Sequence, residues 1–580
     1  MIEIKKLSYS VPEKDLYNNI SITIEENVHY AFIGGNGTGK STLMDMIIHG
    51  DKYLYDGKII FDESALNTRI GYVSQFSGVD NKEDMTVYDF ISDEFIKIDN
   101  RIAQLCEKMA AEENLDEIFE EYQRVLDEKD AIDGDNYDVN IKKQLKLAGI
   151  SNLETHTLSS LSGGELKLVQ VIKEMLLSPK ILMMDEPDAF LDFEHVNALR
   201  DLINYHKGTI VVITHNRYLL NHCFNAIIHL ENCDIQQFEG SYEDYRYELL
   251  ETKIKFEEAA HKDEEEILRQ KAIVDRMRAR ATAIDNASFG RNVHARQTLL
   301  DRLENRKTKL PFVDIKRPDI SFDAGDRIEE TENVVELKNY EASFDEVLLE
   351  HIDFELKQGE KVAIVGKNGT GKTTLLKDII ENKKESVLVN EHINMSMFSQ
   401  VAMNAHIDTT KTALAILEEK GFEKTSDIFV YMEKYGFGEE SLYKKIKDMS
   451  GGEKDLFQLA LMALDKSKLL LLDEPTGHLD LYAQAALEDA IRKYEGAVLM
   501  VSHDFYIVAG CMDYVLLVEE DKLRKMSIRK FRQMIYKNYF DKDYLIREDK
   551  KKEMEMRIEI LLQKKDFEKA DALLQELKNL

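Results

Sequence analysis

Short apolar runs alternate with helix-like segments over most of the chain. Residues 30–33 form an apolar run that ends in a glycine-rich loop, and residues 42–48 after the loop have the apolar spacing of a helix. Residues 181–184 and 210–213 are apolar throughout, which is typical of strands covered on both faces of a parallel sheet. The succession of strand, loop and helix predicts an α/β fold.

The same succession occurs a second time. Apolar runs at residues 362–365, 469–472 and 498–501 follow one another in the order seen before, with the same kinds of residue at their ends. Such a repeat indicates an internal duplication. We call residues 1–240 the first copy and residues 331–540 the second copy.

An insertion distinguishes the first copy from the second. Gln75 and Ser162 are 87 positions apart, whereas Gln400 and Ser450 are 50 apart, so the first copy carries 37 additional residues. They fall within residues 84–147, where apolar residues at three- and four-residue spacing predict helices.

Two further helical segments complete the predicted domain organisation. Residues 241–330 are predicted to form a linker with a helical hairpin, whose arms are residues 245–283 and 293–309. The first arm would extend about 57 Å. Residues 541–580 are predicted as a charged helical tail, either a solvated or weakly coiled helix or, since residues 565–574 resemble the UvrB/UvrC-type motif, a helical hairpin. One stripe of the tail holds Met554, Met556, Ile558, Leu561 and Leu562.

Composition narrows the class of protein. The chain has 580 residues and a formal net charge of −32. About two to four domains are therefore expected, and a surface covered wholly by nucleic acid is disfavoured. No run of about 18 apolar residues occurs, and residues 1–7 lack the apolar core of a signal peptide. We expect a cytoplasmic protein without a membrane segment.

Both copies contain a glycine-rich loop with the spacing G-x-x-x-x-G-K-[ST] between an apolar strand and a helix. The glycines allow backbone N–H groups to converge on phosphate oxygens, and the helix N-terminus adds partial positive charge. The lysine of such a loop reaches the β- and γ-phosphates. The spacing therefore predicts two P-loops that bind ATP. Their residues are Gly34, Gly35, Asn36, Gly37, Thr38, Gly39, Lys40, Ser41 and Thr42 in the first copy, and Gly366, Lys367, Asn368, Gly369, Thr370, Gly371, Lys372, Thr373 and Thr374 in the second.

Polar residues follow the apolar strands of each copy, at the sheet edge where α/β proteins bind ligands. We expect the aspartates to hold Mg²⁺ together with Ser41, Thr373 and the glutamines. The glutamates would act as general base toward water, and the histidines would hydrogen-bond the γ-phosphate. These residues are Gln75, Asp185, Glu186 and His215 in the first copy, and Gln400, Asp473, Glu474 and His503 in the second.

A Ser-Gly-Gly-Glu segment opens a helix in each copy. A serine hydroxyl and glycine N–H groups at a helix N-terminus form a second type of anion site. The chain thus has two loops that hold phosphate from one side and two segments that could close over it from the other. The segments comprise Ser162, Gly163 and Gly164 in the first copy, and Ser450, Gly451 and Gly452 in the second.

Taken together, these segments resemble the ATP-binding cassette superfamily. The tandem copies, the helical insertion and the hairpin between the copies resemble its ABC-F family. The resemblance covers about residues 1–540 and implies two ATP sites, each completed head to tail by the other copy. Residues 34–41 would face residues 450–452, and residues 366–373 would face residues 162–164.

The resemblance also implies aromatic stacking on adenine, for which Phe344 and Tyr9 are the candidates. The first copy departs from the family's Asp-Glu-Pro-Thr-Asn-His-Leu-Asp pattern, because Asp188, Ala189 and Phe190 replace its middle, while the second copy nearly keeps it. Asn216 follows the first copy's histidine where aspartate is usual. Since both catalytic glutamates are present, the resemblance implies ATP hydrolysis at both sites.

The hairpin is a basic element in an acidic chain. From Arg269 to Lys309 there are eleven Lys or Arg and four Asp or Glu, a local charge of +7. Arginine pairs phosphate bidentately, so this charge indicates a nucleic-acid partner, and the alternative is a solvated charged helix pair. The RNA-contact candidates are Arg276, Arg278, Arg280, Arg291 and Arg296.

The resemblance to ABC-F proteins implies that the partner is the ribosome. The hairpin would enter the tRNA exit site of the 50S subunit, near 23S rRNA and the P-site tRNA, and residues 84–147 would touch the L1 side. The chain would be a monomer with an intramolecular cassette dimer.

Two ribosomal functions compete. One is protection from 50S-targeting antibiotics of the lincosamide, pleuromutilin and streptogramin A types, which the divergent first copy favours. The other is a housekeeping translation factor that acts on stalled or initiating ribosomes. A transporter ATPase subunit and a DNA-repair ABC ATPase are further alternatives.

Overall fold

The structure is a computed structural model with two compact units. The first unit comprises Met1–Glu239 and Lys316–Tyr539, and the second comprises Gly240–Ile315 and Phe540–Leu580. The two copies lie in the first unit, whereas the linker hairpin and the tail, predicted as separate segments, share the second. The structure describes residues 2–12, 14–62, 69–75, 83–110, 115–189, 191–281, 296–297, 317–325, 332–343, 347–399, 407–519, 521–539 and 544–579.

A six-stranded sheet forms the centre of the first copy, in the order β5-β6-β7-β3-β8-β9. Neighbouring strands pair in parallel except β8 and β9, which are antiparallel. Strands β6 and β7 are buried along their whole length, as their apolar sequences predict. The strands are β3 (His29–Ile33), β5 (Ile70–Val73), β6 (Ile181–Asp185), β7 (Thr209–Ile213), β8 (Ala226–Glu231) and β9 (Asp234–Glu239).

The second copy repeats this sheet strand for strand, in the order β14-β15-β16-β12-β17-β18. Again the last pair, β17 and β18, is antiparallel. The agreement of the two orders confirms the α/β fold and the internal duplication. The strands are β12 (Lys361–Val365), β14 (Met395–Phe398), β15 (Leu469–Asp473), β16 (Ala497–Val501), β17 (Tyr514–Glu519) and β18 (Lys522–Ser527).

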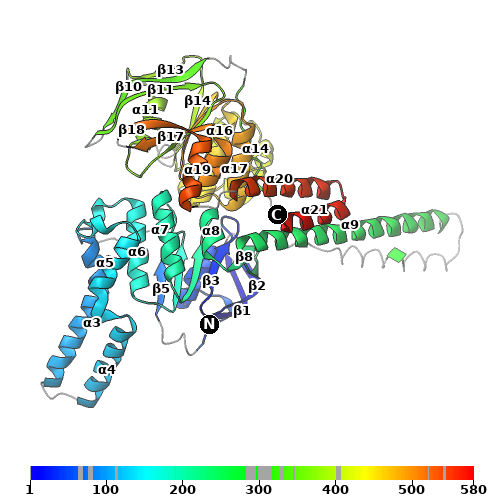
Figure 1. Ribbon diagram of the computed structural model, residues 1–580. Helices are drawn as coiled ribbons and strands as arrows, with labels where there is room; N and C mark the ends of the chain where they lie inside the picture. Colours follow the sequence, from blue (N-terminus) through cyan, green and yellow to red (C-terminus); the bar gives the residue numbers. More distant parts are fainter. Residues whose placement is uncertain are drawn as a thin grey trace. The chain divides into compact units, whose positions relative to one another are not determined.

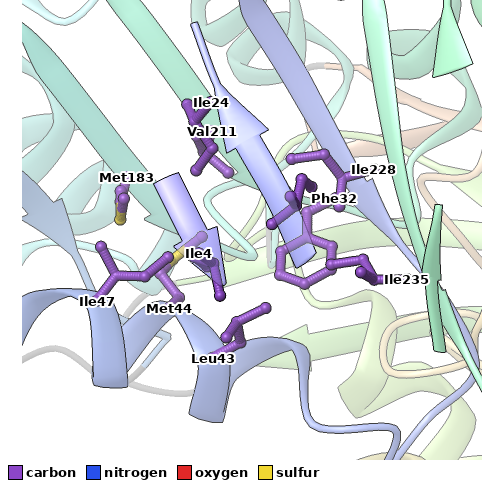
Figure 2. Close-up of a pocket in the computed structure, with 11 residues that line it drawn as sticks. Ile4, Ile24, Phe32, Leu43, Met44, Ile47, Met183, Val211, Ile228 and Ile235 are labelled. Atoms are coloured by element: carbon purple, nitrogen blue, oxygen red, sulfur yellow. The ribbon is translucent and has the colours of Figure 1, made fainter. Parts of the chain in front are cut away.

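Each copy also has a three-stranded antiparallel sheet, β2-β1-β4 in the first and β11-β10-β13 in the second. In the first copy, apolar side chains of this sheet, of α1 and of the central sheet meet in one cluster (Figure 2). The void between them is about 10 Å³, roughly the space of one water molecule, so it is core and not a nucleotide site. The strands are β1 (Ile2–Val11), β2 (Lys14–Ile24), β4 (Asp56–Phe61), β10 (Asn333–Ser343), β11 (Val347–Lys357) and β13 (Val387–Val389).

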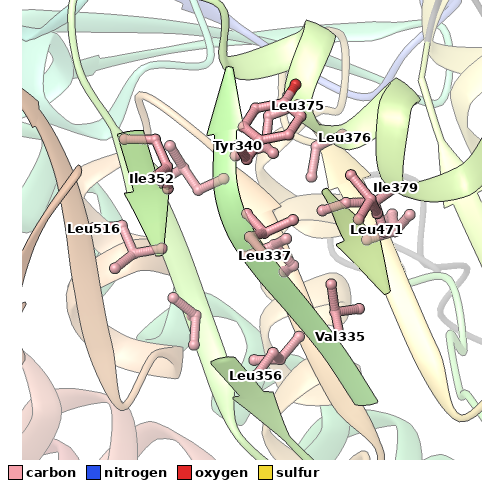
Figure 3. Packing of buried hydrophobic residues seen from close by; sticks show 14 of the residues in the cluster. Val335, Leu337, Tyr340, Ile352, Leu356, Leu375, Leu376, Ile379, Leu471 and Leu516 are labelled. Carbon is pink, nitrogen blue, oxygen red and sulfur yellow. The ribbon is translucent and has the colours of Figure 1, made fainter. Parts of the chain in front are cut away.

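The equivalent core of the second copy is shown in Figure 3. Side chains of β10 and β11 pack on those of α11 and of the central strands β15 and β17. Each P-loop helix is therefore fixed between two sheets. The helices that flank the sheets are α1 (Lys40–Ile48), α6 (Gly163–Leu176), α7 (Phe193–Tyr205) and α8 (Arg217–Cys223) in the first copy, and α11 (Lys372–Glu381), α13 (Ala413–Glu419), α14 (Thr425–Glu433), α15 (Glu439–Leu442), α16 (Gly451–Leu464), α17 (Leu481–Lys493), α18 (Phe505–Cys511) and α19 (Ile528–Tyr539) in the second.

The insertion of the first copy is helical, as predicted. It consists of α3 (Val87–Ala110), α4 (Leu115–Ala131) and α5 (Tyr137–Leu147). Helices α3 and α4 run side by side as a pair (Figure 1), and an ion pair between Arg101 and Glu121 joins them. Among the helices that the structure describes, none has both the length and the apolar composition needed to cross a bilayer.

The second unit contains α9 (Tyr242–Ala281), α20 (Tyr544–Gln563) and α21 (Phe567–Lys578). The long first arm is confirmed as far as it is described, although it begins at Tyr242 and not at residue 245. Most of the second arm, residues 293–309, lies outside the described residues. The two tail helices form a hairpin whose apolar side packs on α9 in a cluster with Ile254.

The prediction of a solvated tail helix is therefore wrong, because Met554, Ile558 and Leu562 are buried in that cluster. Met556 does not share the stripe predicted for it with these three residues, since it is 45% exposed. Residues 554, 558 and 562 are four apart and share one helix face, whereas residue 556 lies on another face. The α9 partner of the tail lies about 300 positions earlier in the chain, so the pattern of the tail alone does not reveal it.

Candidate functional site: two nucleotide sites

Both glycine-rich loops join a central strand to a helix, β3 to α1 and β12 to α11. Gly39 has a φ of 104° and Gly371 a φ of 84°, and each forms the N-cap of the helix that follows. Residues with a side chain rarely adopt this left-handed conformation, so glycine permits the turn. The turn directs backbone N–H groups and the helix N-terminus to the same place, which suits an anionic phosphate.

The loop lysines are buried inside their own loops. The Lys40 Nζ donates to the carbonyls of Gly34 and Gly35, both at 2.9 Å. The Lys372 Nζ donates to the carbonyls of Gly366 and Lys367. Burial lowers the pKa of both lysines below the usual range. A lysine ammonium group together with the backbone N–H groups of the loop supplies the hydrogen-bond donors that a polyphosphate requires. These loops therefore fit ATP.

A hydroxyl and an aspartate meet in each copy at the predicted metal position. The Thr373 Oγ1 donates to the Asp473 Oδ1 at 3.0 Å, and in the first copy the Ser41 hydroxyl acts on the Asp185 carboxyl to lower its pKa. Burial raises the pKa of Asp185 to about 6, and its Oδ1 has no hydrogen-bond partner among the described residues. Oxygen donors of this kind are those that Mg²⁺ binds, so the residues fit the cation.

The predicted catalytic glutamates share an unusual backbone conformation. Glu186 has a φ of 46° and Glu474 a φ of 47°, which is strained for residues with a side chain. The Gln75 Nε2 donates to the Glu186 Oε2 at 2.7 Å, and the His503 N–H donates to the Glu474 Oε2 at 3.1 Å. Burial raises the pKa of both carboxyls, which brings them closer to the value of an effective general base.

The two predicted histidines differ in their contacts. The His503 Nε2 lies 3.1 Å from the Asn368 Oδ1 of its own P-loop. Neither ring nitrogen of His215 has a hydrogen-bond partner among the described residues, although the ring is buried. Burial lowers the pKa of both histidines, so both are neutral at neutral pH. A neutral imidazole can still donate one hydrogen bond to a phosphate oxygen.

The first P-loop contacts the second copy directly. The Asn36 N–H donates to the Asp480 Oδ2 at 2.9 Å, and the Asn36 Nδ2 donates to the His478 carbonyl at 2.8 Å. A Cβ added to Gly452 would lie 1.9 Å from the Asn36 Nδ2. The structure thus brings residues 34–41 and residues 450–452 together.

The second P-loop contacts residues of the first copy that follow its Asp-Glu-Pro segment. The Lys367 Nζ lies 3.1 Å from the Glu194 Oε2, and the Phe193 ring lies 5.9 Å from that of His503. Ser162 is the N-cap of α6, and Gly163 and Gly164 are the first residues of this helix. That these three residues face the second P-loop stays a prediction.

The two Ser-Gly-Gly-Glu segments are closed by capping boxes. Ser162 and Ser450 are the N-caps of α6 and α16, and each hydroxyl accepts the N–H of the glutamate three residues later. The carboxylates of Glu165 and Glu453 accept the serine N–H groups in return, each at 2.8 Å. This reciprocal pair fixes the start of each helix and keeps the glycine N–H groups at its end.

Three charged residues near the sites were not predicted. The Glu231 Oε2 at the end of β8 accepts the Gly35 N–H at 2.9 Å. The Lys167 Nζ on α6 donates to the carbonyl of Gln75 at 2.9 Å and so fixes the segment that carries this glutamine. Asp455 takes the place of Lys167 in the second copy and is buried. A carboxylate at a strand end could have indicated Glu231, but no sequence signal marks Lys167.

The remaining candidates are only partly described. Tyr9 stacks on Tyr17 at 6.3 Å between ring centroids and meets Tyr53 edge-on at 5.8 Å, so its contact with adenine stays a prediction. Phe344 and Gln400 lie outside the described residues.

The hairpin arginines are described in part. Arg276, Arg278 and Arg296 are exposed. Arg278 donates to Gln297 at 2.9 Å, and Arg296 donates to Gln270 at 2.8 Å, so residues 296–297 lie beside α9 as an antiparallel hairpin requires. Arg291 and the side chain of Arg280 lie outside the description, and RNA contact by any of the five arginines stays a prediction.

Comparisons with known proteins agree with this geometry. A family model described as ABC transporter matches residues 17–189 and 349–477, and a second one with the same description matches residues 228–322. The ABC transporter ATP-binding protein YfmM of Bacillus subtilis strain 168 is 29% identical over 537 residues, which cover 87% of this chain and 96% of YfmM. The energy-dependent translational throttle protein EttA of Mycobacterium tuberculosis strain H37Rv is 27% identical over 543 residues, which cover 89% of this chain and 91% of EttA. The archaeal ribosome recycling factor aABCE1, solved with a ribosomal stalk protein, shares the fold with a TM-score of 0.56 at 17% identity and 92% coverage of both chains.

Proposed function

Because the chain belongs to the ABC-F family of ATP-binding cassette proteins, we propose that it is a ribosome-binding ATPase in which closure of the two copies sets the position of the basic hairpin. The chain is an ATPase with two cassette domains. The observation that carries the proposal is the pair of hydrogen bonds from Asn36 to the second copy, at 2.9 and 2.8 Å. They make the first nucleotide site dependent on both copies.

The roles of the chain's own residues follow from their positions. ATP and Mg²⁺, when bound, supply the phosphoryl group to be transferred and a cation that neutralises its charge. The hydroxyl–aspartate pairs, Ser41 with Asp185 and Thr373 with Asp473, would hold the cation. Glu186, whose carboxylate accepts a hydrogen bond from Gln75, would orient a water molecule and accept its proton. Because residues of both copies surround one site, occupancy by ATP favours the closed arrangement.

The ribosome is proposed as partner from two observations. The name of the relative EttA describes a translational throttle, and the hairpin presents exposed arginines at Arg276, Arg278 and Arg296 in a chain of net charge −32. Arginines on an extended element suit a cavity lined by phosphates. We propose that the hairpin occupies the tRNA exit site of the 50S subunit, with 23S rRNA and the P-site tRNA as its contacts.

Sedimentation with ribosomes tests this proposal. Glu186→Gln together with Glu474→Gln should stop hydrolysis, retain ATP and hold the chain on 70S ribosomes in a gradient. Adding Arg276→Gln, Arg278→Gln and Arg296→Gln should release it, whereas Lys338→Gln, Lys383→Gln and Lys466→Gln, which remove the same charge elsewhere, should not. If the Glu186→Gln, Glu474→Gln variant stays at the top of the gradient in the presence of ATP, the ribosomal role is overturned.

Two versions of this role remain as candidates. The relationship to EttA favours a translation factor that acts on stalled or initiating ribosomes. The divergent first copy, with Asp188 and Asn216 where its counterpart has Thr476 and Asp504, favours protection of the ribosome from lincosamide, pleuromutilin or streptogramin A drugs. Growth of a susceptible host with and without the gene separates them, since a translation factor would leave the inhibitory concentration of all three drug types unchanged.

A further inference from the structure

The end of the second copy has an unusual charge. Residues 522–540 contain seven Lys or Arg and no Asp or Glu. The equivalent residues in sequence, 234–252, run from β9 of the first copy into α9 of the second unit and contain six Asp or Glu and one Arg. The two equivalent strand-to-helix segments therefore have opposite charge, although the whole chain is acidic.

The basic side chains are exposed where the strand β18 passes into the helix α19. Lys522 and Arg524 alternate along β18, the outer strand of its sheet, and Arg529 and Lys530 lie in the first turn of α19. All four are exposed. Arg524 lies 3.4 Å from Glu519, and this exposed pair contributes little to stability. We call these four residues the basic edge.

Other basic residues of the segment have structural contacts and are not included. The Lys525 Nζ lies 3.6 Å above the centroid of the Tyr514 ring. Arg532 donates to the Ala509 carbonyl. The side chain of Lys537 lies outside the description, and among the described side chains of this segment the basic edge is the part of the charge that no packing contact explains.

Local stability does not account for the basic edge either. Cations in the first turn of a helix oppose its dipole, which favours anions there. Helix α9, which follows the equivalent strand of the first copy, has Glu243 and Asp244 in its first turn, as the dipole favours. Lysines on an outer strand can discourage pairing between chains, but that role needs no cations on α19, and β9 of the first copy has no lysine.

We propose that the basic edge binds the phosphate backbone of RNA, at a surface of the second copy that belongs to a different unit from the hairpin. Several cations fixed on a strand and a helix can meet successive phosphates, and affinity for nucleic acid comes largely from such contacts. The inference rests on the proposed ribosomal function for the identity of the RNA, but the binding itself is a property of the chain alone.

The test is fluorescence anisotropy of a short labelled RNA duplex with the full chain over a range of salt concentrations. The test variant combines Lys522→Gln, Arg524→Gln, Arg529→Gln and Lys530→Gln. The control variant combines Lys338→Gln, Lys383→Gln, Lys424→Gln and Lys466→Gln, which are exposed lysines of the same unit and the same net charge change. Unchanged ATP hydrolysis in both variants shows that they are folded.

The test variant should bind the duplex at least about tenfold more weakly than the unmodified chain. The slope of log K against log salt concentration should fall by the amount expected for about three lost phosphate contacts. The control variant should lose much less affinity. Equal losses in both variants, or none in either, would overturn the inference. Binding of vesicles with anionic lipid that depends on the basic edge, without any effect on RNA, would overturn it in favour of a membrane surface. If the hydrolysis-deficient chain still sediments with ribosomes but binding of the RNA duplex does not depend on the basic edge, this inference fails and the proposed function stands.

Discussion

The guanidinium of Arg217 and the carboxylate of Glu488 form a buried ion pair between the two copies. Arg217 opens α8, two positions after His215, and its guanidinium lies 4.9 Å from the centroid of the Tyr506 ring. Glu488 lies on α17, whose N-cap Asp480 accepts the N–H of Asn36 in the first P-loop. One helix of the second copy thus contacts the first copy at its P-loop and beside its histidine.

Loss of one member of this pair should weaken both stability and hydrolysis. Arg217→Met leaves the Glu488 carboxylate buried without its cation, which destabilises by roughly 3–5 kcal/mol. Arg217→Met with Glu488→Leu removes both charges and should recover most of the stability. Thermal unfolding measures the first effect. ATP hydrolysis in a Glu474→Gln background, where the first site alone is active, measures the second.

An exposed pair between the copies provides the control. Glu194 and the Lys367 Nζ are 3.1 Å apart, but their side chains are 63% and 71% exposed. Glu194→Ala should therefore change stability by less than about 1 kcal/mol. If Glu194→Ala and Arg217→Met have the same effect, burial is not what gives the Arg217 pair its importance.

The Ser-Gly-Gly segment of the second copy should not tolerate a side chain at Gly452. A Cβ there would lie 1.9 Å from the Asn36 Nδ2 and 2.8 Å from the backbone carbonyl of His478. Asn36 could rotate away, but a backbone atom cannot. In the Glu474→Gln background, Gly452→Ala should reduce hydrolysis at the first site by about tenfold or more, equivalent to roughly 1.4 kcal/mol of barrier.

Gly438 is the matched control for this change. It has a φ of −79°, and no heavy atom lies within 4 Å of an added Cβ. Gly438→Ala should leave hydrolysis at the first site unchanged. Loss of activity in both variants would mean that general destabilisation, and not closure on Asn36, is responsible.

The sequence predicted what depends on short local patterns. Lys40, Asp185 and Glu186 were found because the loop and the strand end each need a fixed set of residues within a few positions. The Arg217–Glu488 pair could not be found, because its members are 271 positions apart and each alone looks like an ordinary helix residue. The orientation of two folded copies decides which side chains meet, and no periodicity along the chain contains that information.

The buried carboxyl of Asp455 should make stability depend on pH. Burial raises its pKa to about 7, whereas an unfolded aspartate titrates near 3.9. Between these values the folded state binds more protons, so the free energy of unfolding falls as pH rises from about 4 to 7 and stays low above. Asp455→Asn should remove this loss, which is at most about 4 kcal/mol.

Calorimetry of the second copy's unfolding at two pH values measures the difference. The thermal midpoint of Asp455→Asn should exceed that of the unmodified chain clearly near pH 8, and by less near pH 5.5. Asp465→Asn changes an exposed aspartate and should shift neither midpoint. A gain for Asp455→Asn that is the same at both pH values would contradict the titration of this carboxyl.

Two isoleucines of α20 test whether the tail is held on α9 by its apolar side. Ile558 is fully buried among Ile254, Leu562 and Ala570, whereas Ile560 is 48% exposed. Ile558→Ala removes buried apolar volume and should destabilise the second unit by roughly 2–4 kcal/mol. Ile560→Ala should change it by less than about 0.5 kcal/mol. Hydrogen exchange of α20 amides in the full chain measures both effects, since the free energy of local opening is read directly from protection. Equal protection in the two variants would show that the apolar cluster does not hold the tail, and that ion pairs such as Arg246–Glu555 hold it instead.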